Sequence, residues 1–319
     1  MKHFLLLILA ASASFTGAAW AQSDYPTKPI RMVVGFPPGG GNDIIARLLG
    51  AKLQEAWGQT VVIDNRPGAN SNVAIEIAAK AAPDGYTLLF NASGMVINPA
   101  MYTSLPFDTI RDFDPISQVA TFPFLLAVHP SVPWRTVDDL VARAKSQPGK
   151  INYGSGAAAF QFAFELFKQQ VGVDIFHIPY KGSVQSINAV LANDIQLVIV
   201  DALAAIPHLK SGRLRGLAVT SGKRASGLPG IPTMMEAGVA GYDVTGWAGV
   251  FAPAGTPKLA LNKLNQQIVR IVHLLDFRER LLALGSEPVG SSSDEFATIM
   301  RNQSRKWKEV NKTAHIAAE

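Results

Sequence analysis

The sequence of 319 residues contains no cysteine, and this absence removes several classes of chemistry at once. A disulfide framework, a thiol nucleophile, a lipid anchor on cysteine and a cysteine-ligated metal are all excluded. The six histidines include no pair four residues apart and no cluster with carboxylates, so we expect neither a metal site nor a cofactor. Because single cores stop growing near ~250–300 residues, a chain of this length can form two domains.

Long apolar runs and dense basic runs are also missing from most of the chain. Beyond the first residues, no stretch reaches the ~18 consecutive apolar residues that a membrane-spanning helix needs. The formal net charge is +5, but the lysines and arginines are scattered among acidic residues and form no stripe. A nucleic-acid partner would require such a stripe, so none is expected.

The first 21 residues have the pattern of a secretory signal peptide. Lys2 and His3 precede an apolar run over residues 4–11, and small residues lead to an A-x-A cleavage site that ends at Ala21. We therefore expect export to the periplasm, with cleavage after about Ala21.

The strongest local signal is the stretch Phe-Pro-Pro-Gly-Gly-Gly-Asn-Asp over residues 36–43. It follows a β-branched apolar run and precedes an amphipathic helical pattern. The three glycines, Gly39, Gly40 and Gly41, permit a close approach of the backbone to a ligand. Asn42 or Asp43 is the expected N-cap of the helix. Since a helix N-terminus favours negative charge, we expect this turn to bind an anion, most simply a carboxylate.

Other readings of the glycine-rich turns lack their defining residues. The glycines at 39–41 are not followed by Lys-Ser or Lys-Thr, and they do not form G-x-G-x-x-G with a partner acid, so neither nucleotide-binding motif is present. The run around Ser155 does not fit G-x-S-x-G, and no His–Asp pairing accompanies Ser155 or Ser93. An exported hydrolase is therefore a remote alternative.

Short apolar runs alternate with helical patterns along the chain, which favours an α/β fold with mostly parallel sheets. The turns at Phe36, Asn65 and Asn91 each follow an expected strand and are expected to share one sheet edge. A second small-residue turn, Gly154 to Ala159, again joins a strand to a helix. An extended run over residues 116–128 is expected to be broken at Pro123.

Two lobes joined by two crossovers, near Phe122 and near Trp247, would enclose a hinged cleft. The sequence predicts one lobe from residues 22–122 and 248–319 and the other from residues 123–247. The C-terminal helix could pack across both lobes.

Several longer runs relate the chain to a known family. They include YPTKPIRMVVGFPPGGGNDIIAR at 25–47, VVIDNRPGAN at 61–70, INPAMY at 97–102, ELFKQQVGVDIFHIPYKGS at 165–183 and FAPAGTP at 251–257. With these runs the chain resembles the periplasmic solute receptors of tripartite tricarboxylate transporters, of the Bug type, over nearly its whole mature length. The resemblance implies a monomeric, two-lobed receptor of the Venus-flytrap (periplasmic binding protein) class. It implies no catalytic activity and a transient contact with membrane permease subunits.

In similar proteins the ligand carboxylate is held by backbone amides and ordered waters between two strand-to-helix loops, one in each lobe. On this sequence those loops are residues 36–43 and 154–160. The chain departs from the family over residues 159–162, where the family usually has a small or polar residue followed by histidine, and at Ala202, where it commonly has asparagine. Both changes remove polar groups. We therefore expect a pocket for one carboxylate with a more apolar lining beyond it, which disfavours citrate and favours a less polar mono- or dicarboxylate.

The predicted ligand-binding residues come from the two turns, from the helix that follows the second turn, and from three other strand ends or turns. They are Phe36, Gly39, Gly40, Gly41, Asn42, Asp43, Ser93, Gly154, Ser155, Gly156, Ala157, Ala158, Phe160, Phe162, Lys181 and Asp201.

Several choices stay open at this point. Phe160 and Phe162 point to different helix faces, so only one is expected to line the cleft. Lys181 could face solvent or the ligand, and Asp201 could bond the ligand or cap the next helix. Arg66 is expected to brace its own turn. The sequence does not distinguish delivery to a permease from reporting to a membrane signalling partner.

Overall fold

A computed structural model describes residues 25–317 of the chain. The expected signal peptide and its cleavage site lie outside the described residues. Within residues 25–317, no helix is both long enough and apolar enough to cross a membrane.

The strands form a ten-stranded sheet in the order β2-β1-β3-β9-β4-β7-β5-β6, with β10 and β8 also pairing with β4. Their bounds are β1 Ile30–Val34, β2 Val61–Asn65, β3 Thr87–Ala92, β4 Phe113–Val128, β5 Asn152–Ser155, β6 Phe176–Pro179, β7 Leu197–Asp201, β8 Arg215–Val219, β9 Thr245–Pro253 and β10 Glu287–Pro288.

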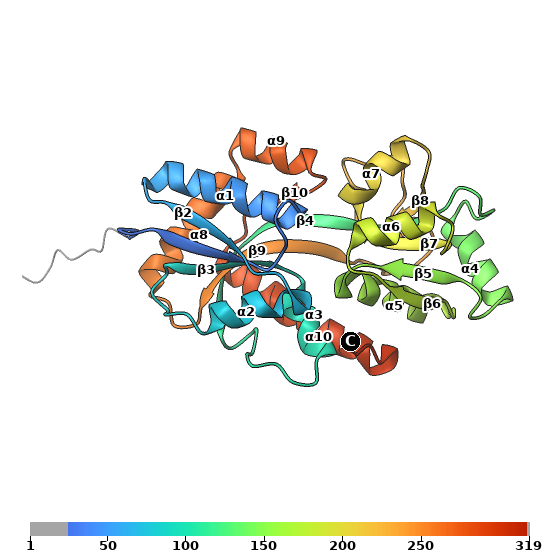
Figure 1. Ribbon diagram of the computed structural model, residues 1–319, viewed down its shortest axis with the longest axis horizontal. Coiled ribbons are helices and arrows are strands. Elements are labelled where there is room, and N and C mark those ends of the chain that lie inside the picture. Colours follow the sequence, from blue (N-terminus) through green and yellow to red (C-terminus); the bar gives the residue numbers. More distant parts are fainter. Residues whose placement is uncertain (1–24, 318–319) are drawn as a thin grey trace, which may run out of the picture.

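Helices cover both faces of this sheet (Figure 1). Their bounds are α1 Gly41–Trp57, the 3-10 helix η1 Ala69–Ser71, α2 Asn72–Ala79, α3 Gly94–Met101, α4 Val137–Ser146, α5 Ala158–Val171, α6 Ser183–Leu191, α7 Ala202–Lys210, α8 Lys258–Val272, α9 Leu275–Ala283 and α10 Ser293–Ala314.

Two strands, β4 and β9, run between the two halves of the molecule and make it two-lobed (Figure 1). The first part of β4 pairs with β9 and β10, and its last five residues pair with β7 and β8. All of these pairings are antiparallel, so the sheets are mixed, and the expected parallel pairing holds only for the outer strands. The reason is geometrical: a strand that leaves a lobe and a strand that returns beside it must run in opposite directions.

The expected break at Pro123 is wrong, because β4 continues through it from Phe113 to Val128. Pro123 is the last residue of β4 to pair with β9, and Phe124 is the first to pair with β7. A residue without an N–H group is tolerated where the ladder changes partner.

The strand ends meet at one edge of the first lobe, as expected. Val34 at the end of β1 lies in register with Asn65 on one side and with Phe90 on the other. The β1–α1 turn, the β2–η1 connection and the β3–α3 turn therefore begin at the same edge, where ligands of α/β sheets bind.

The core follows the two-residue period of the strands. Met32 and Val34 of β1 face a cluster that includes α1, α8 and α9, while Val33 faces a cluster that includes α2, α3 and α10. The second cluster continues into the other lobe. There Trp307 of α10 packs edge-to-face on Phe162 of α5, with ring centroids 5.9 Å apart. Helix α10 thus contacts elements on both sides of the crossing strands.

Candidate functional site

The β1–α1 turn forms the first wall of the cleft. Its conformation depends on Gly39, whose φ of 83° is left-handed and suits glycine. Helix α1 begins at Gly41 with Gly40 as N-cap, and no side chain caps it. The expectation that Asn42 or Asp43 is the N-cap is therefore wrong, since both lie in the first turn of the helix. The first N–H groups of α1 stay available to a ligand.

Asp43 braces this turn from behind and does not face the cleft. Its side chain is 2 % exposed. It accepts hydrogen bonds from the Gly39 N–H (2.8 Å), the Arg47 Nε (2.9 Å) and the Asn65 Nδ2 (2.7 Å). Burial opposes ionisation, but the bonds from Arg47, Gly39 and Asn65 outweigh it and lower the pKa of the carboxyl. The prediction of Asp43 as a ligand contact is corrected to a positioning role, because its oxygens are already occupied.

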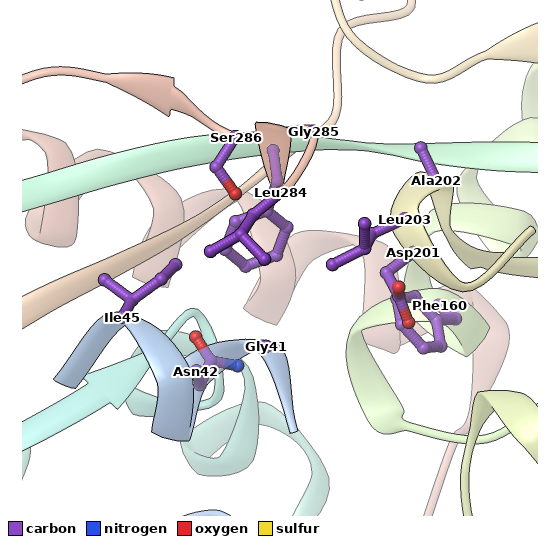
Figure 2. Close-up of a pocket in the computed structure, with 11 residues that line it drawn as sticks. Gly41, Asn42, Ile45, Phe160, Asp201, Ala202, Leu203, Leu284, Gly285 and Ser286 are labelled. Carbon is purple, nitrogen blue, oxygen red and sulfur yellow. The ribbon is translucent and has the colours of Figure 1, made fainter. Parts of the chain in front are cut away.

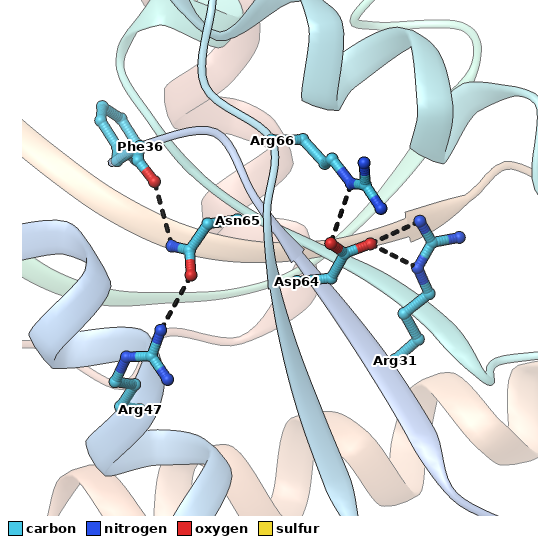
Figure 3. Close-up of polar contacts among 6 residues, drawn as sticks. All are labelled: Arg31, Phe36, Arg47, Asp64, Asn65 and Arg66. Atoms are coloured by element: carbon cyan, nitrogen blue, oxygen red, sulfur yellow. Dashed lines mark hydrogen bonds and ion pairs between the residues drawn. The ribbon is translucent and has the colours of Figure 1, made fainter. Parts of the chain in front are cut away.

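Asn65 extends the brace to the peptide of Phe36 (Figure 3). Its Nδ2 donates to the Phe36 carbonyl at 3.0 Å, and its Oδ1 accepts from the Arg47 Nη2 at 2.8 Å. Nearby, Arg66 donates to Asp64 at 2.8 Å, which fits the expectation that Arg66 braces its own turn. Side chains from β2 and α1 thus hold the first wall in shape without a ligand.

The β5–α5 turn forms the second wall. Helix α5 begins at Ala158 with Ala157 as N-cap, and again no side chain caps it. Gly156 is required by packing, because a Cβ there would lie 2.1 Å from the backbone of Gly182. Gly154 belongs to β5, where a Cβ would lie 2.5 Å from the Ile195 side chain. Gly154 therefore serves sheet packing, and its prediction as a ligand contact is corrected.

Ser155 is 3 % exposed, and its Oγ lies 2.8 Å from the His177 Nε2. Burial lowers the pKa of His177 to about 4, with a smaller contribution from Lys168, so the imidazole is neutral near pH 7. Within residues 25–317 the His177 ring has no other hydrogen bond, so no third group orients it as a catalytic base. The pair fixes the Ser155 hydroxyl beside the second wall.

A pocket of about 110 Å³, the α1–α5 pocket, lies between the two walls. Three helix N-termini reach it, from α1, α3 and α5, and none of the three has a side-chain cap. Its lining includes Phe36, Asn42, Asn70, Ser93, Asn98 and Phe160. Because helix N-termini carry partial positive charge and free N–H groups, this pocket suits a carboxylate.

Asn98 brings an unpaired polar atom to the α1–α5 pocket. Its side chain is fully buried, and its Nδ2 donates to the Asn70 carbonyl (2.8 Å) and to Asn72 Oδ1 (2.6 Å). Its Oδ1 has no partner, and neither has the Oδ1 of Asn42 in the same pocket. Buried polar atoms are normally hydrogen-bonded, and an amide oxygen accepts, so these two oxygens suit a donor such as a bridging water.

A second pocket of about 140 Å³, the α1–α7 pocket, shares Asn42, Phe122 and Phe160 with the first and continues the cleft. Gly41 and Asn42 lie on one side of it and Leu203 and Asp201 on the other (Figure 2). The Oδ1 of Asp201 accepts from the Ala204 N–H (2.9 Å), and its Oδ2 accepts from the Ser183 Oγ (2.6 Å). Asp201 therefore both caps α7 and lines the cleft.

The open choices among the remaining residues are answered by their positions. Phe160 lines both pockets and packs edge-to-face on Phe124 at 4.8 Å, whereas Phe162 is fully buried in the core. The prediction of Phe162 as a ligand contact is corrected, because its ring points away from the cleft toward α10. Lys181 is exposed and lines neither pocket, so it belongs to a solvated turn.

The sequence reasoning missed Asn70, Asn98, Phe122 and Leu203, which all line the cleft. A signal existed for the two asparagines, because Asn70 ends the run VVIDNRPGAN and Asn98 lies in INPAMY. Among the described residues, no group of three or more His, Asp or Glu side chains could hold a metal ion.

Comparison with known proteins relates this chain to a family of receptors. The model of the tripartite tricarboxylate transporter family receptor, TctC, matches residues 45–316. The BugT protein of Bordetella pertussis is 33 % identical over 95 % of this chain and 94 % of its own length. An R. palustris protein solved with adipate is 36 % identical with a TM-score of 0.84, covering 92 % of this chain and 99 % of that one. MatC from Rhodopseudomonas palustris with bound malate is 27 % identical with a TM-score of 0.79, covering 90 % and 99 %.

Proposed function

Since this chain belongs to the tripartite tricarboxylate transporter receptor family, we propose that it captures a small organic carboxylate between its two lobes and delivers it to a tripartite tricarboxylate-type membrane transporter. Proteins of this family are periplasmic solute-binding proteins, and two structural neighbours were solved with the carboxylates adipate and malate. Its place of action would be the periplasm, after removal of residues 1–21. It would act as a monomer and without catalysis.

One observation carries the proposal: two helix N-termini from different lobes, those of α1 and α5, reach the same pocket without a side-chain cap. Each N-terminus is worth about 0.3–1 kcal/mol to a nearby anion at the surface and up to about 2 kcal/mol when partly buried. A carboxylate has four lone-pair directions and can accept from both turns at once. Neither wall alone surrounds the anion, so binding requires both lobes.

The binding residues that we propose come from both walls and from the turn between them. The contacts to the carboxylate would be made by the first N–H groups of α1 and α5, by Asn42 and Ser93, and by Asn70 directly or through water. Asn98 would act only through a bridging water that donates to its Oδ1, because its Nδ2 already donates to Asn70 and Asn72. Phe36, Phe122 and Phe160 would exclude bulk water, which strengthens each polar contact.

Closure would take place at β4 and β9. We propose that residues 22–122 and 248–319 move as one body against residues 123–247, with the pivot near Phe122 and Trp247. A ligand that contacts both walls binds the closed form better than the open form and shifts the equilibrium by that difference in affinity. The closed form would then be the one that a permease recognises.

The first experiment compares carboxylates with neutral isosteres on purified residues 22–319. Thermal unfolding is followed with adipate, malate, hexanoate and phenylacetate, and with hexanamide as the neutral counterpart of hexanoate. A ligand present at about 100 times its Kd stabilises the folded state by about 2.7 kcal/mol, which is easily seen as a raised Tm. We expect at least one carboxylate to raise the Tm and hexanamide to have little effect.

The proposal fails if no carboxylate raises the Tm, or if hexanamide stabilises the protein as well as hexanoate does. Turnover of an ester panel by the same preparation would contradict the absence of catalysis.

A further inference from the structure

We propose that the ligand is a monocarboxylate whose body is an apolar ring or chain of about six carbons, and not a dicarboxylate. The inference rests on the proposed function, because it assumes that a carboxylate binds at the α1–α5 pocket. It concerns what the α1–α7 pocket admits at the other end of the ligand.

Among the described residues, no positively charged side chain in the cleft is available to bind a second carboxylate of the ligand. No described lysine or arginine lines the α1–α5 pocket or the α1–α7 pocket. A third hollow, which shares Ala157 and Ala158 with the α1–α5 pocket, is lined by His177. This histidine is neutral near pH 7 because burial lowers its pKa to about 4. The one described carboxylate that lines the cleft is Asp201, in the α1–α7 pocket. A second carboxylate of the ligand would therefore meet no cation in this cleft.

The helix N-termini at the two ends of the cleft also favour an anion at one end only. Helices α1 and α5 begin without a side-chain cap, so their partial positive charge is free to act on a ligand. Helix α7 begins beside the other pocket, but the carboxylate of Asp201 already accepts from its Ala204 N–H. That end of the cleft thus carries a full negative charge instead of an unsatisfied helix N-terminus. A like charge brought next to it is repelled.

The lining of the α1–α7 pocket suits a hydrocarbon. Its side chains include Ile45 from α1, Phe160 from α5, Leu203 from α7 and Leu284 after α9, together with Phe122. The volume of about 140 Å³ is close to the ~150 Å³ apolar cavity that is known to hold benzene. A body of about six carbons therefore fills this pocket while its carboxylate remains at the α1–α5 pocket.

Leu203 limits the length of the ligand. Its side chain lies 3.9 Å from the position that a Cβ on Gly41 would take, and it is also 3.9 Å from that position at Gly285. Leu203 of α7 therefore lies across the pocket from Gly41 and Gly285 and bounds it on that side. The pocket therefore ends in an aliphatic wall.

Isothermal titration with hexanoate and adipate tests the inference directly, because the two ligands have the same chain length and differ by one carboxylate. Like-charge contacts cost several kcal/mol, so we expect hexanoate to bind the parent protein at least about tenfold more tightly than adipate. Phenylacetate serves as the ring probe and is expected to bind in the range of hexanoate.

Asp201→Asn tests the stated cause. Asparagine is also a good N-cap, so α7 keeps its start while the negative charge is removed. We expect the ratio of the adipate Kd to the hexanoate Kd to fall by about tenfold. Asp194→Asn is the matched control, because Asp194 is exposed and lines neither pocket. Leu203→Lys adds a cation to the same pocket and should invert the preference toward adipate.

The outcomes separate the two proposals. If adipate binds the parent as tightly as hexanoate, or if neither Asp201→Asn nor Leu203→Lys lowers the ratio, this inference is overturned while carboxylate capture stands. If malate binds but hexanoate and phenylacetate do not, the inference is overturned while carboxylate capture stands. If none of hexanoate, phenylacetate, adipate and malate binds, carboxylate capture fails and the inference fails with it.

Discussion

The buried carboxylate of Asp43 offers the sharpest test of how the first wall is built. We predict that Asp43→Asn loosens the β1–α1 turn and destabilises the protein without altering the size of the side chain. The three groups that face this carboxylate, from Gly39, Arg47 and Asn65, are all donors. An amide offers one oxygen and turns its NH₂ group toward a donor, so at least one bond is lost.

The magnitude follows from the surroundings of each donor. A hydrogen bond to a charged group contributes about 1.5–3 kcal/mol, but the Arg47 side chain is 51 % exposed and its ion pair counts for at most about 1 kcal/mol. The exposed Gly39 can bond water when the carboxylate is absent. Only the contact with Asn65 is lost in a desolvated place. A loss of about 2 kcal/mol follows, which lowers the Tm by about 4–8 °C.

The pH dependence gives a second readout of the same group. The pKa of Asp43 is lowered from its ordinary value of 3.8 on folding, so its contribution to stability is present above pH 3.8 and is lost as the pH falls through the lower value in the folded protein. The difference in Tm between the parent and Asp43→Asn should therefore shrink between pH 5 and pH 2.

Thermal unfolding by circular dichroism at several pH values, with Asp194→Asn as the exposed control, measures both effects. A parent and an Asp43→Asn variant with Tm values within about 1 °C at pH 7 would refute the bracing role, since even one lost buried bond of about 1 kcal/mol shifts the Tm by more.

Three further predictions concern the two walls. Gly41→Val should leave the Tm nearly unchanged but weaken hexanoate binding by at least about tenfold, because the new side chain enters the α1–α7 pocket opposite Leu203; unchanged affinity would show that the turn is only structural. Gly156→Ala should cost about 1–3 kcal/mol in a denaturant titration, because its Cβ would meet backbone and not a movable side chain; full stability would contradict this. Phe160→Ala and Phe162→Ala should both lower the Tm, since Phe→Ala in a core costs about 3–5 kcal/mol. Calorimetry should show weaker hexanoate binding for Phe160→Ala alone. An equal loss of hexanoate affinity in both variants would contradict the assignment of Phe160 to the cleft and Phe162 to the core.

The two walls could be predicted from the sequence because their signals are local. A β-branched run, adjacent small residues and an amphipathic pattern together specify a strand, a turn and a helix N-terminus. The same local reasoning placed the N-cap two or three residues too late at Asn42 and Asp43. The partners that draw Asp43 behind the turn, above all Asn65, come from another strand and cannot be read from the first turn.

The choice between Phe160 and Phe162 also needed the structure. Two residues apart on a helix face in different directions, but the sequence does not say which direction leads to the cleft. That depends on α10, whose Trp307 covers Phe162 and lies about 145 residues later in the chain. The continuity of β4 through Pro123 could not be predicted for a similar reason, because the change of partner strand is set by distant residues.

The position of β9 in the sheet has a consequence for the order in which the molecule can fold. β9 lies between β3 and β4, so each of these two strands lacks its neighbour on that side until residues 245–253 have been added to the chain. The β7-β5-β6 pairings, by contrast, involve only residues 152–201 and can form earlier. Contacts of high sequence separation form slowly because a long loop must close first. The joining of β3 to β4 through β9 would thus come late, although the β2-β1-β3 pairings that carry the first wall involve only residues 30–92. A chain that stops before β9 would expose the edges of β3 and β4 to pairing with other chains.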